Sequence, residues 1–149
     1  MKRPALAIRE ADLPPSAREL VRLVGWRGAM ALVREMPGAR IYCPVRGVAH
    51  SRPADARYAQ VAELAGERGA ARLYKEYAGA IFEVPTCRAA IRSARDRHVR
   101  ALYDASTPVE QICAATGISR RQVFYVLKTV DEGAGPARPA DLGGQMGLF

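Results

Sequence analysis

A chain of 149 residues with 49% hydrophobic content is long enough for one ordinary domain or two small ones, and this composition excludes a disordered protein. The 23 Lys and Arg outnumber the 15 Asp and Glu, and the resulting net charge of +8 suits a polyanionic partner such as nucleic acid. Charge alone leaves open a basic surface that only keeps the protein soluble. No apolar run reaches the length of a signal peptide or of a membrane span, so we expect a cytoplasmic protein with no membrane partner.

The three cysteines, Cys43, Cys87 and Cys113, are odd in number, far apart and without metal-ligand spacing. We therefore expect no disulfide framework, no metal site and no cofactor. The sequence also offers no carboxylate pair, no nucleophile with a base and no phosphate loop, and His98 has no acid or nucleophile at a suitable spacing. An enzyme is not expected.

A segment of twenty residues occurs twice, 41 residues apart and without a gap, and nine of the twenty pairs are identical. The first copy begins at Gly25 and reads GWRGAMALVREMPGARIYCP; the second begins at Gly66 and reads GERGAARLYKEYAGAIFEVP. Each copy, together with the helix expected before it, predicts helix, glycine, helix, glycine, strand and proline. We expect two structurally equivalent copies.

In the first copy, Ser16 and Glu19 predict a capping box for a helix that Gly25 ends. A second helix and a strand at 39–43 follow, and in the second copy the strand is expected at 80–84. The residues expected to face inward are Ala29, Leu32, Val33 and Met36 in the first copy, and Tyr58, Val61, Leu64, Ala70, Leu73, Tyr74 and Tyr77 in the second.

Two short strands form a marginal sheet whose free edges invite pairing. We therefore predict that residues 1–85 form a dimerisation domain and that the protein is a homodimer. The alternative is a self-contained α+β mini-domain whose strands pair only with each other.

Residues 86–105 are predicted as a helix with an apolar side formed by Ile91, Ala94, His98 and Leu102. Arg88, Arg92 and Arg95 recur on another side at helical spacing and could follow a phosphate backbone. A solvated arginine face is the alternative.

Two helix starts lie twelve residues apart in the segment TPVEQICAATGISRRQVFYVLKTV, which runs from Thr107 to Val130. Capping boxes are predicted for Thr107 with Glu110 and for Ser119 with Gln122. Gly117 suits the tight turn between the helices, because glycine adopts a left-handed conformation without strain. Residues 86–130 are therefore predicted to form a helix-turn-helix DNA-binding domain.

The apolar positions of this segment match the packing of two crossing helices: Ile112, Cys113, Ile118, Val123, Val126, Leu127 and Val130. The other face of the second helix carries the candidate DNA contacts, which are Ser119, Arg120, Arg121, Gln122, Phe124, Tyr125 and Lys128. Arginine can bind guanine bidentately, glutamine can bind adenine, and an aromatic ring can contact a thymine methyl group or a phosphate. The alternative is a helical hairpin used for protein contact.

Residues 131–144 are rich in Gly, Pro and Ala, which predicts a flexible tether. The five residues that follow, Gln145, Met146, Gly147, Leu148 and Phe149, carry apolar side chains with no evident folding role. They resemble the bacterial sliding-clamp binding motif, in which a glutamine hydrogen-bonds and a Leu-Phe pair fills a hydrophobic pocket. Gln145, Leu148 and Phe149 match these anchors, and Met146 replaces the usual leucine. The alternative is a disordered chain end with no binding partner.

Four segments together resemble the Mor transcription activators of Mu-like bacteriophages: LPPSARELVRLVG from Leu13, GARIYCP from Gly38, GAIFEVP from Gly79 and ISRRQVFYVLK from Ile118. The resemblance covers about residues 13 to 130. It implies an intertwined homodimer with strands of both subunits in one sheet, and a helix-turn-helix of each subunit in adjacent major grooves of a dyad-symmetric site.

The same resemblance implies activation of a phage or prophage promoter by recruiting host RNA polymerase. By position, residues 119–128 would be the recognition segment, and residues 81–85 would lie near DNA at the domain junction. The loop at 45–53 and the tail after Val130 depart from the family pattern.

These observations predict a mainly α protein with a small β-sheet, divided into a duplicated dimerisation domain (1–85), a helix-turn-helix domain (86–130) and a tail (131–149). The expected function is that of a dimeric, sequence-specific transcription activator that binds double-stranded DNA and is nucleoid-associated in a bacterial host. The alternative is a replication-linked DNA-binding protein that docks on the sliding clamp through residues 145–149.

Overall fold

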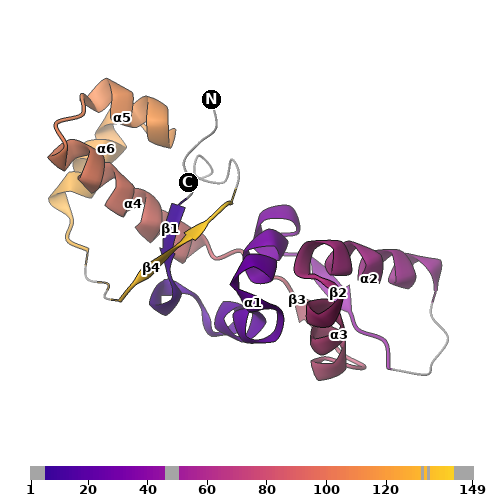
Figure 1. Ribbon diagram of the computed structural model, residues 1–149. Coiled ribbons are helices and arrows are strands. Elements are labelled where there is room, and N and C mark those ends of the chain that lie inside the picture. The colour runs from indigo at the N-terminus through magenta and orange to yellow at the C-terminus, as the bar shows by residue number, and fades with distance from the viewer. Residues whose placement is uncertain (1–5, 46–50, 132, 134, 143–149) are drawn as a thin grey trace. The chain divides into compact units, whose positions relative to one another are not determined.

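The computed structural model describes residues 6–45, 51–131, 133 and 135–142 (Figure 1). The chain divides into two compact units: unit 1 comprises Met1–Leu13 and Arg88–Phe149, and unit 2 comprises Pro14–Cys87. The described residues form six α-helices and two small antiparallel sheets of two strands each. The expectation of a mainly α protein with a small β component is confirmed.

Unit 2 contains the two copies of the repeat. Its elements are α1 (Pro15–Glu35), β2 (Arg40–Tyr42), α2 (Arg52–Ala65), α3 (Glu67–Glu76) and β3 (Ile81–Glu83). Gly25 interrupts α1 with φ 79° and ψ 169°, and Gly66 separates α2 from α3 with φ 83° and ψ 157°. Residues with a Cβ atom rarely adopt this conformation, so the two equivalent glycines allow the same break between two helices.

The two strands of unit 2 pair with each other in antiparallel register, with Ile41 opposite Phe82. These two residues are equivalent in the repeat, and the flanking hydrogen bonds are equivalent too: Gly38 N donates to Val84 O at 2.9 Å, and Gly79 N donates to Cys43 O at 2.7 Å. The ribbon therefore has a local two-fold relation within one chain. This is the pairing of the mini-domain alternative, and the homodimer stays a prediction.

The helices of the two copies approach closely at a second equivalent pair of glycines. A Cβ atom on Gly28 would lie 3.2 Å from Ala65 Cα, and one on Gly69 would lie 3.2 Å from Val24 Cβ. Val24 and Ala65 are themselves 41 residues apart, so the contact is reciprocal. The side chains predicted to face inward in the first copy are all buried, namely Ala29, Leu32, Val33 and Met36. In the second copy Val61, Ala70 and Leu73 are buried, whereas Tyr58, Leu64, Tyr74 and Tyr77 are half-buried.

The capping box predicted at Ser16 is wrong. α1 begins after Pro14, which provides no side-chain cap, because two consecutive prolines set the helix start. The Glu19 carboxylate instead accepts hydrogen bonds from Arg22. A cap that the sequence reading missed lies at Ser51, whose hydroxyl accepts from Ala54 N at 3.3 Å.

Unit 1 contains β1 (Leu6–Arg9), a short 3-10 helix (Glu10–Asp12), α4 (Arg88–Asp104), α5 (Val109–Thr116), α6 (Arg120–Lys128) and β4 (Ala137–Ala140). β1 pairs antiparallel with β4, with Leu6 opposite Ala140 and Arg9 opposite Ala137. β1 also lies against α4 (Figure 1). Leu6 and Ile8 of β1 are buried.

The predicted domain boundaries differ from these units in two places. Residues 6–13, which were assigned to the dimerisation domain, belong to unit 1, and residues 137–140, which were assigned to a flexible tether, form β4. The cause is the pairing of two four-residue segments about 130 positions apart, and neither segment is long enough to show a strand pattern alone.

Among the described residues, no helix is both long and apolar enough to cross a membrane.

Candidate nucleic-acid interface

The two short helices predicted at residues 107–130 are present as α5 and α6, and Gly117 connects them in the left-handed conformation at φ 76° and ψ 13°. They pack with α4 around one apolar cluster formed by Val99, Ile112, Ile118, Val123 and Val126. Leu102, Val109, Cys113 and Leu127 pack against this cluster and are partly buried. The predicted turn, the insertion of Ile118 and most of the buried stripe are confirmed.

The start of α6 is capped as predicted. Ser119 Oγ accepts from Gln122 N at 3.2 Å, and Gln122 Oε1 accepts from Ser119 N at 3.2 Å. The equivalent box at the start of α5 is wrong: the N-cap is Pro108, and no side-chain cap forms there. Proline displaces the helix start by one residue, so Thr107 lies outside the capping position.

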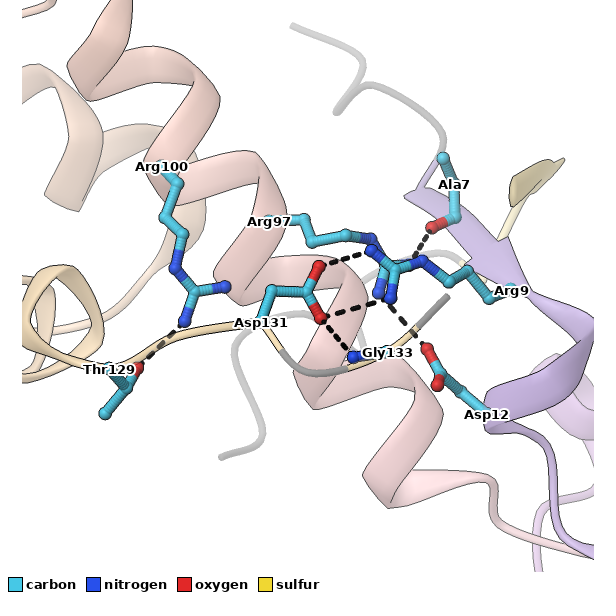
Figure 2. A network of polar contacts seen from close by, with 8 residues as sticks. All are labelled: Ala7, Arg9, Asp12, Arg97, Arg100, Thr129, Asp131 and Gly133. Atoms are coloured by element: carbon cyan, nitrogen blue, oxygen red, sulfur yellow. Dashed lines mark hydrogen bonds and ion pairs between the residues drawn. The ribbon is translucent and has the colours of Figure 1, made fainter. Parts of the chain in front are cut away.

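The C-terminal end of α6 is held by α4. Arg100 Nη2 donates to Thr129 Oγ1 at 2.8 Å (Figure 2). It also donates to Val126 O at 3.4 Å. Thr129 Oγ1 in turn donates to Val126 O at 2.7 Å. A cation at this end also offsets the partial negative charge of the helix terminus. Because both ends of α6 are fixed, its exposed side chains are presented from a rigid support.

The exposed face of α6 contains the residues proposed from the sequence. Arg121, Gln122, Phe124, Tyr125 and Lys128 are all exposed, and Tyr125 keeps 70% of its surface accessible. Val130, expected in the buried stripe, is 82% exposed because α6 ends at Lys128 and the chain leaves the helix before reaching it. We call Arg121, Gln122, Phe124, Tyr125 and Lys128 the exposed α6 face.

Arg120 precedes this face and is held in place by two neighbours. Its Nη1 donates to Glu110 Oε1 at 2.8 Å, and its guanidinium carbon lies 5.3 Å from the centre of the Phe124 ring. Glu110 comes from the first turn of α5, where the sequence predicted a capping role for it. The ion pair thus connects the two helices across their outer surface.

The three arginines proposed on α4 do not share one environment. Arg88 and Arg92 are exposed, whereas Arg95 is only 5% exposed, and its guanidinium donates to Asp96 Oδ1 at 2.8 and 3.0 Å. The prediction that Arg95 follows a phosphate backbone together with Arg88 and Arg92 is therefore wrong, and so is the alternative of one solvated face for all three. Helical spacing places the three on one side of α4, but β1 packs on α4 and makes part of its surface internal.

Figure 2 shows a polar network of unit 1 that the sequence analysis missed. Arg9 and Asp131 form a two-pronged ion pair, one contact of which is Nη1 to Oδ1 at 3.1 Å, and Asp131 Oδ1 also accepts from Gly133 N at 3.1 Å. Arg97 donates to Asp12 Oδ2 at 3.1 Å and to Ala7 O at 2.8 Å. Arg97 thus joins α4 to the N-terminal segment of the unit, and Arg9 joins that segment to the residues that follow α6. No local sequence signal reveals them, because the partners are 122 and 85 positions apart.

The cations of unit 1 differ in whether the fold already pairs them. Arg9, Arg95, Arg97 and Arg120 are bound to carboxylates of the fold. Within the part of the chain that the structure describes, Arg88, Arg121 and Lys128 make no ion pair. Two of these three uncommitted charges lie on the exposed α6 face, where an anionic ligand could reach them without breaking an existing contact.

The cysteines of unit 2 are unreactive in this fold. Burial raises the pKa of both the Cys43 and the Cys87 thiol to about 11, so both are protonated at neutral pH. Across residues 6–45, 51–131, 133 and 135–142, no group of three or more His, Cys, Asp and Glu side chains is placed to hold a metal ion. The proposed partner-binding residues Gln145, Met146, Leu148 and Phe149 lie outside the described residues.

Comparison of the chain with protein-family models, with curated proteins and with solved structures gives no significant match.

Proposed function

We propose that the chain is a sequence-specific DNA-binding transcription regulator that reads base edges with α6. The observation that carries the proposal is the exposed α6 face: a helix fixed at both ends that presents arginine, glutamine, tyrosine and lysine. Among the described residues, Arg121 and Lys128 make no ion pair. In helix-turn-helix proteins the second helix enters the major groove, and its N-terminal residues contact base edges.

The side chains of this face suit separate tasks in DNA binding. Arg121 and Gln122 lie in the first turn of α6. Arg121 suits a bidentate contact with guanine, and Gln122, whose Oε1 accepts from Ser119 N, can still donate to a base from its amide nitrogen. Tyr125 follows Arg121 by one helical turn, and its ring could contact a thymine methyl group or a phosphate. Lys128 at the last turn suits a phosphate. Arg88 and Arg92 of α4 are further candidates for phosphate contacts.

A homodimer is part of the proposal, and a surface of unit 2 supports it. The outer face of the β2–β3 ribbon exposes Tyr42 and Ile81, which lie opposite each other, beside the opposite-charge pair Arg40 and Glu83. A face with an apolar centre and both charge signs can be self-complementary across a two-fold axis. Two copies would present two α6 helices to a dyad-symmetric site. Ile81→Arg should yield monomers in sedimentation equilibrium. A dimer with an unchanged dissociation constant would show that this surface is not the dimer interface.

Activation of a phage or prophage promoter by recruiting host RNA polymerase rests on the resemblance to Mor activators. Transcription from a promoter that carries the bound site should rise when the protein is added to purified polymerase. A fall in transcription would instead indicate a repressor.

The test of DNA reading is selection of bound duplexes from a random pool, followed by affinity measurements on the selected site. Arg121→Ala and Tyr125→Ala should each weaken binding to that site about tenfold or more, because a good base contact contributes about 1–3 kcal/mol. Glu63→Ala, at an exposed position of α2, is the control and should bind as the wild type does. Unchanged binding by both α6 variants would show that another surface reads the DNA.

The second candidate function is replication-linked, with residues 145–149 docking on the sliding clamp. Its support is the match of Gln145, Leu148 and Phe149 to the anchors of the clamp motif. Full-length protein should bind purified clamp, and the triple alanine variant of these anchors should not. Equal binding by both proteins, or by neither, would remove this candidate.

A further inference from the structure

Glu110 is an acidic residue placed where DNA phosphates would be expected if α6 enters the groove. It lies in the first turn of α5, does not cap that helix and reaches across the turn to Arg120, ten residues further along the chain. The pair is open to solvent, with 77% of the Glu110 side chain and 62% of the Arg120 side chain exposed. An exposed pair of this kind adds little to folding stability, so stability does not explain the carboxylate.

Arg120 itself occupies an electrostatically unfavourable position. It is the first residue of α6. The N-terminus of a helix carries partial positive charge, so a cationic side chain is disfavoured there. Glu110 offsets this charge, and the Phe124 ring 5.3 Å from the guanidinium carbon restricts the direction of the side chain. The guanidinium is therefore neutralised and oriented before any ligand arrives.

We infer that Glu110 is a specificity-determining residue, which restrains Arg120 and so suppresses binding to DNA of unrelated sequence. This inference rests on the proposed function. A phosphate that captures Arg120 must displace Glu110 and then lies near its free carboxylate. At a cognate site α6 binds through its base contacts while the Arg120–Glu110 pair stays intact, whereas at an unrelated site only phosphate contacts are available and Arg120 must leave Glu110 to add one. Specificity rises because the cost of breaking the pair falls on the complex with unrelated DNA.

The experiment compares wild type with Glu110→Gln, which keeps the shape of the side chain and removes its charge. The probes are a labelled random-sequence duplex and the duplex selected from the random pool, each titrated at several salt concentrations. Asp104→Asn is the matched control, because it removes one exposed negative charge from unit 1 at a residue that makes no described contact with Arg120. Thermal unfolding checks that the variants fold alike.

Glu110→Gln should bind the random duplex about two- to fivefold more tightly, the factor that an exposed ion pair contributes. Its salt dependence on that duplex should steepen by up to about 0.9 in log–log slope, as expected for one more effective phosphate contact. Affinity for the selected duplex should rise less, so that the ratio of specific to non-specific binding falls. In an Arg120→Gln background, the substitution at Glu110 should have no further effect beyond that of Asp104→Asn.

Three results would overturn the inference. Equal effects of Glu110→Gln and Asp104→Asn would reduce the role of Glu110 to its contribution to net charge. Weaker binding of Glu110→Gln to both duplexes would show that the carboxylate favours DNA binding rather than restraining it. If the wild type bound neither duplex, the proposed function would fail and the inference with it, whereas the first two results leave DNA binding intact.

Discussion

The two units are built by different means. Unit 2 joins two copies of a local pattern, and its defining contacts recur at equivalent positions, such as Ile41 with Phe82 in the ribbon. Unit 1 has no repeat and is completed by contacts between distant segments, such as Arg9 with Asp131 and Arg97 with Asp12. A repeat can be recognised in the sequence, so it predicts the fold of unit 2. Single ion pairs between distant segments leave no sequence pattern, so the way in which unit 1 is held together cannot be predicted from them. The following predictions test whether this difference in construction is also a difference in energetics.

The largest effect is expected from truncating equivalent core leucines of unit 2. Leu32 and Leu73 are 41 positions apart and are both fully buried. Leu32→Ala and Leu73→Ala should therefore each lower the free energy of unfolding by about 2–5 kcal/mol, and by similar amounts. Urea unfolding followed by the fluorescence of Trp26, the single tryptophan, reports on this unit directly.

The control for this pair is Arg72→Ala, at an exposed position of α3, which should change stability by less than about 0.5 kcal/mol. If one leucine proved several-fold more costly to truncate than the other, the two copies would be equivalent in backbone but not in packing.

A smaller effect is expected at the glycines that break the helices of each copy. Gly25 and Gly66 both have positive φ, and a Cβ atom on either would meet no atom within 4 Å. The cost of Gly25→Ala or Gly66→Ala is thus backbone strain alone, about 1–3 kcal/mol. The same urea titration measures it. A neutral substitution at either glycine would show that the break can form with another backbone conformation.

These positions also show how much of the fold the sequence predicts. The repeat predicts both glycine breaks, both strands and the buried faces of unit 2, because each depends on residues close together in the chain. The turn at Gly117 and the exposed α6 face are predicted for the same reason. The β1–β4 pairing and the burial of Arg95 are not, since both depend on which distant segment packs against α4.

Local patterns are also incomplete where proline competes with them. Ser16 and Thr107 each match the first position of a capping box, but proline sets the helix start next to both. The sequence therefore predicts a capping role for Glu110 at the start of α5, whereas its carboxylate accepts a hydrogen bond from Arg120. This contact was not predicted, because it joins residues of two different helices.

A pair of substitutions in unit 1 separates a formed cap from an unformed one. Ser119→Ala removes the hydroxyl that accepts from Gln122 N, and it should lower stability by about 1 kcal/mol. Thr107→Ala changes a residue that makes no cap and should have an effect near zero. Circular dichroism of thermal unfolding measures both variants. Equal losses would mean that Thr107 stabilises the start of α5 in some other way.

The smallest effect is expected from Asp131→Asn. This substitution tests most directly whether the Arg9–Asp131 ion pair holds the distant segments of unit 1 together. Hydrogen bonds from Arg9 hold the pKa of Asp131 below its ordinary value of 3.8. A carboxyl group with a lowered pKa in the folded state adds stability in full above its unfolded value, and that contribution is lost as the pH falls through the lowered pKa. Wild type should therefore be more stable than Asp131→Asn at pH 7, and the difference should begin to shrink as the pH falls below about 3.8.

The measurement is urea unfolding of both proteins from pH 7 down to pH 3, with hydrogen exchange of β1 and β4 amides at pH 7. If Asp131→Asn increases the exchange rates of β1 and β4 amides relative to wild type, and those of α6 amides less, Asp131 holds the strand pair against the rest of unit 1. Asp104→Asn, at an exposed acidic residue at the end of α4, is the matched control, and its exchange should follow that of the wild type. If the two strands stayed protected in Asp131→Asn, closure of unit 1 would rest on the buried side chains of β1, and the two units would be less different in construction than their contacts suggest.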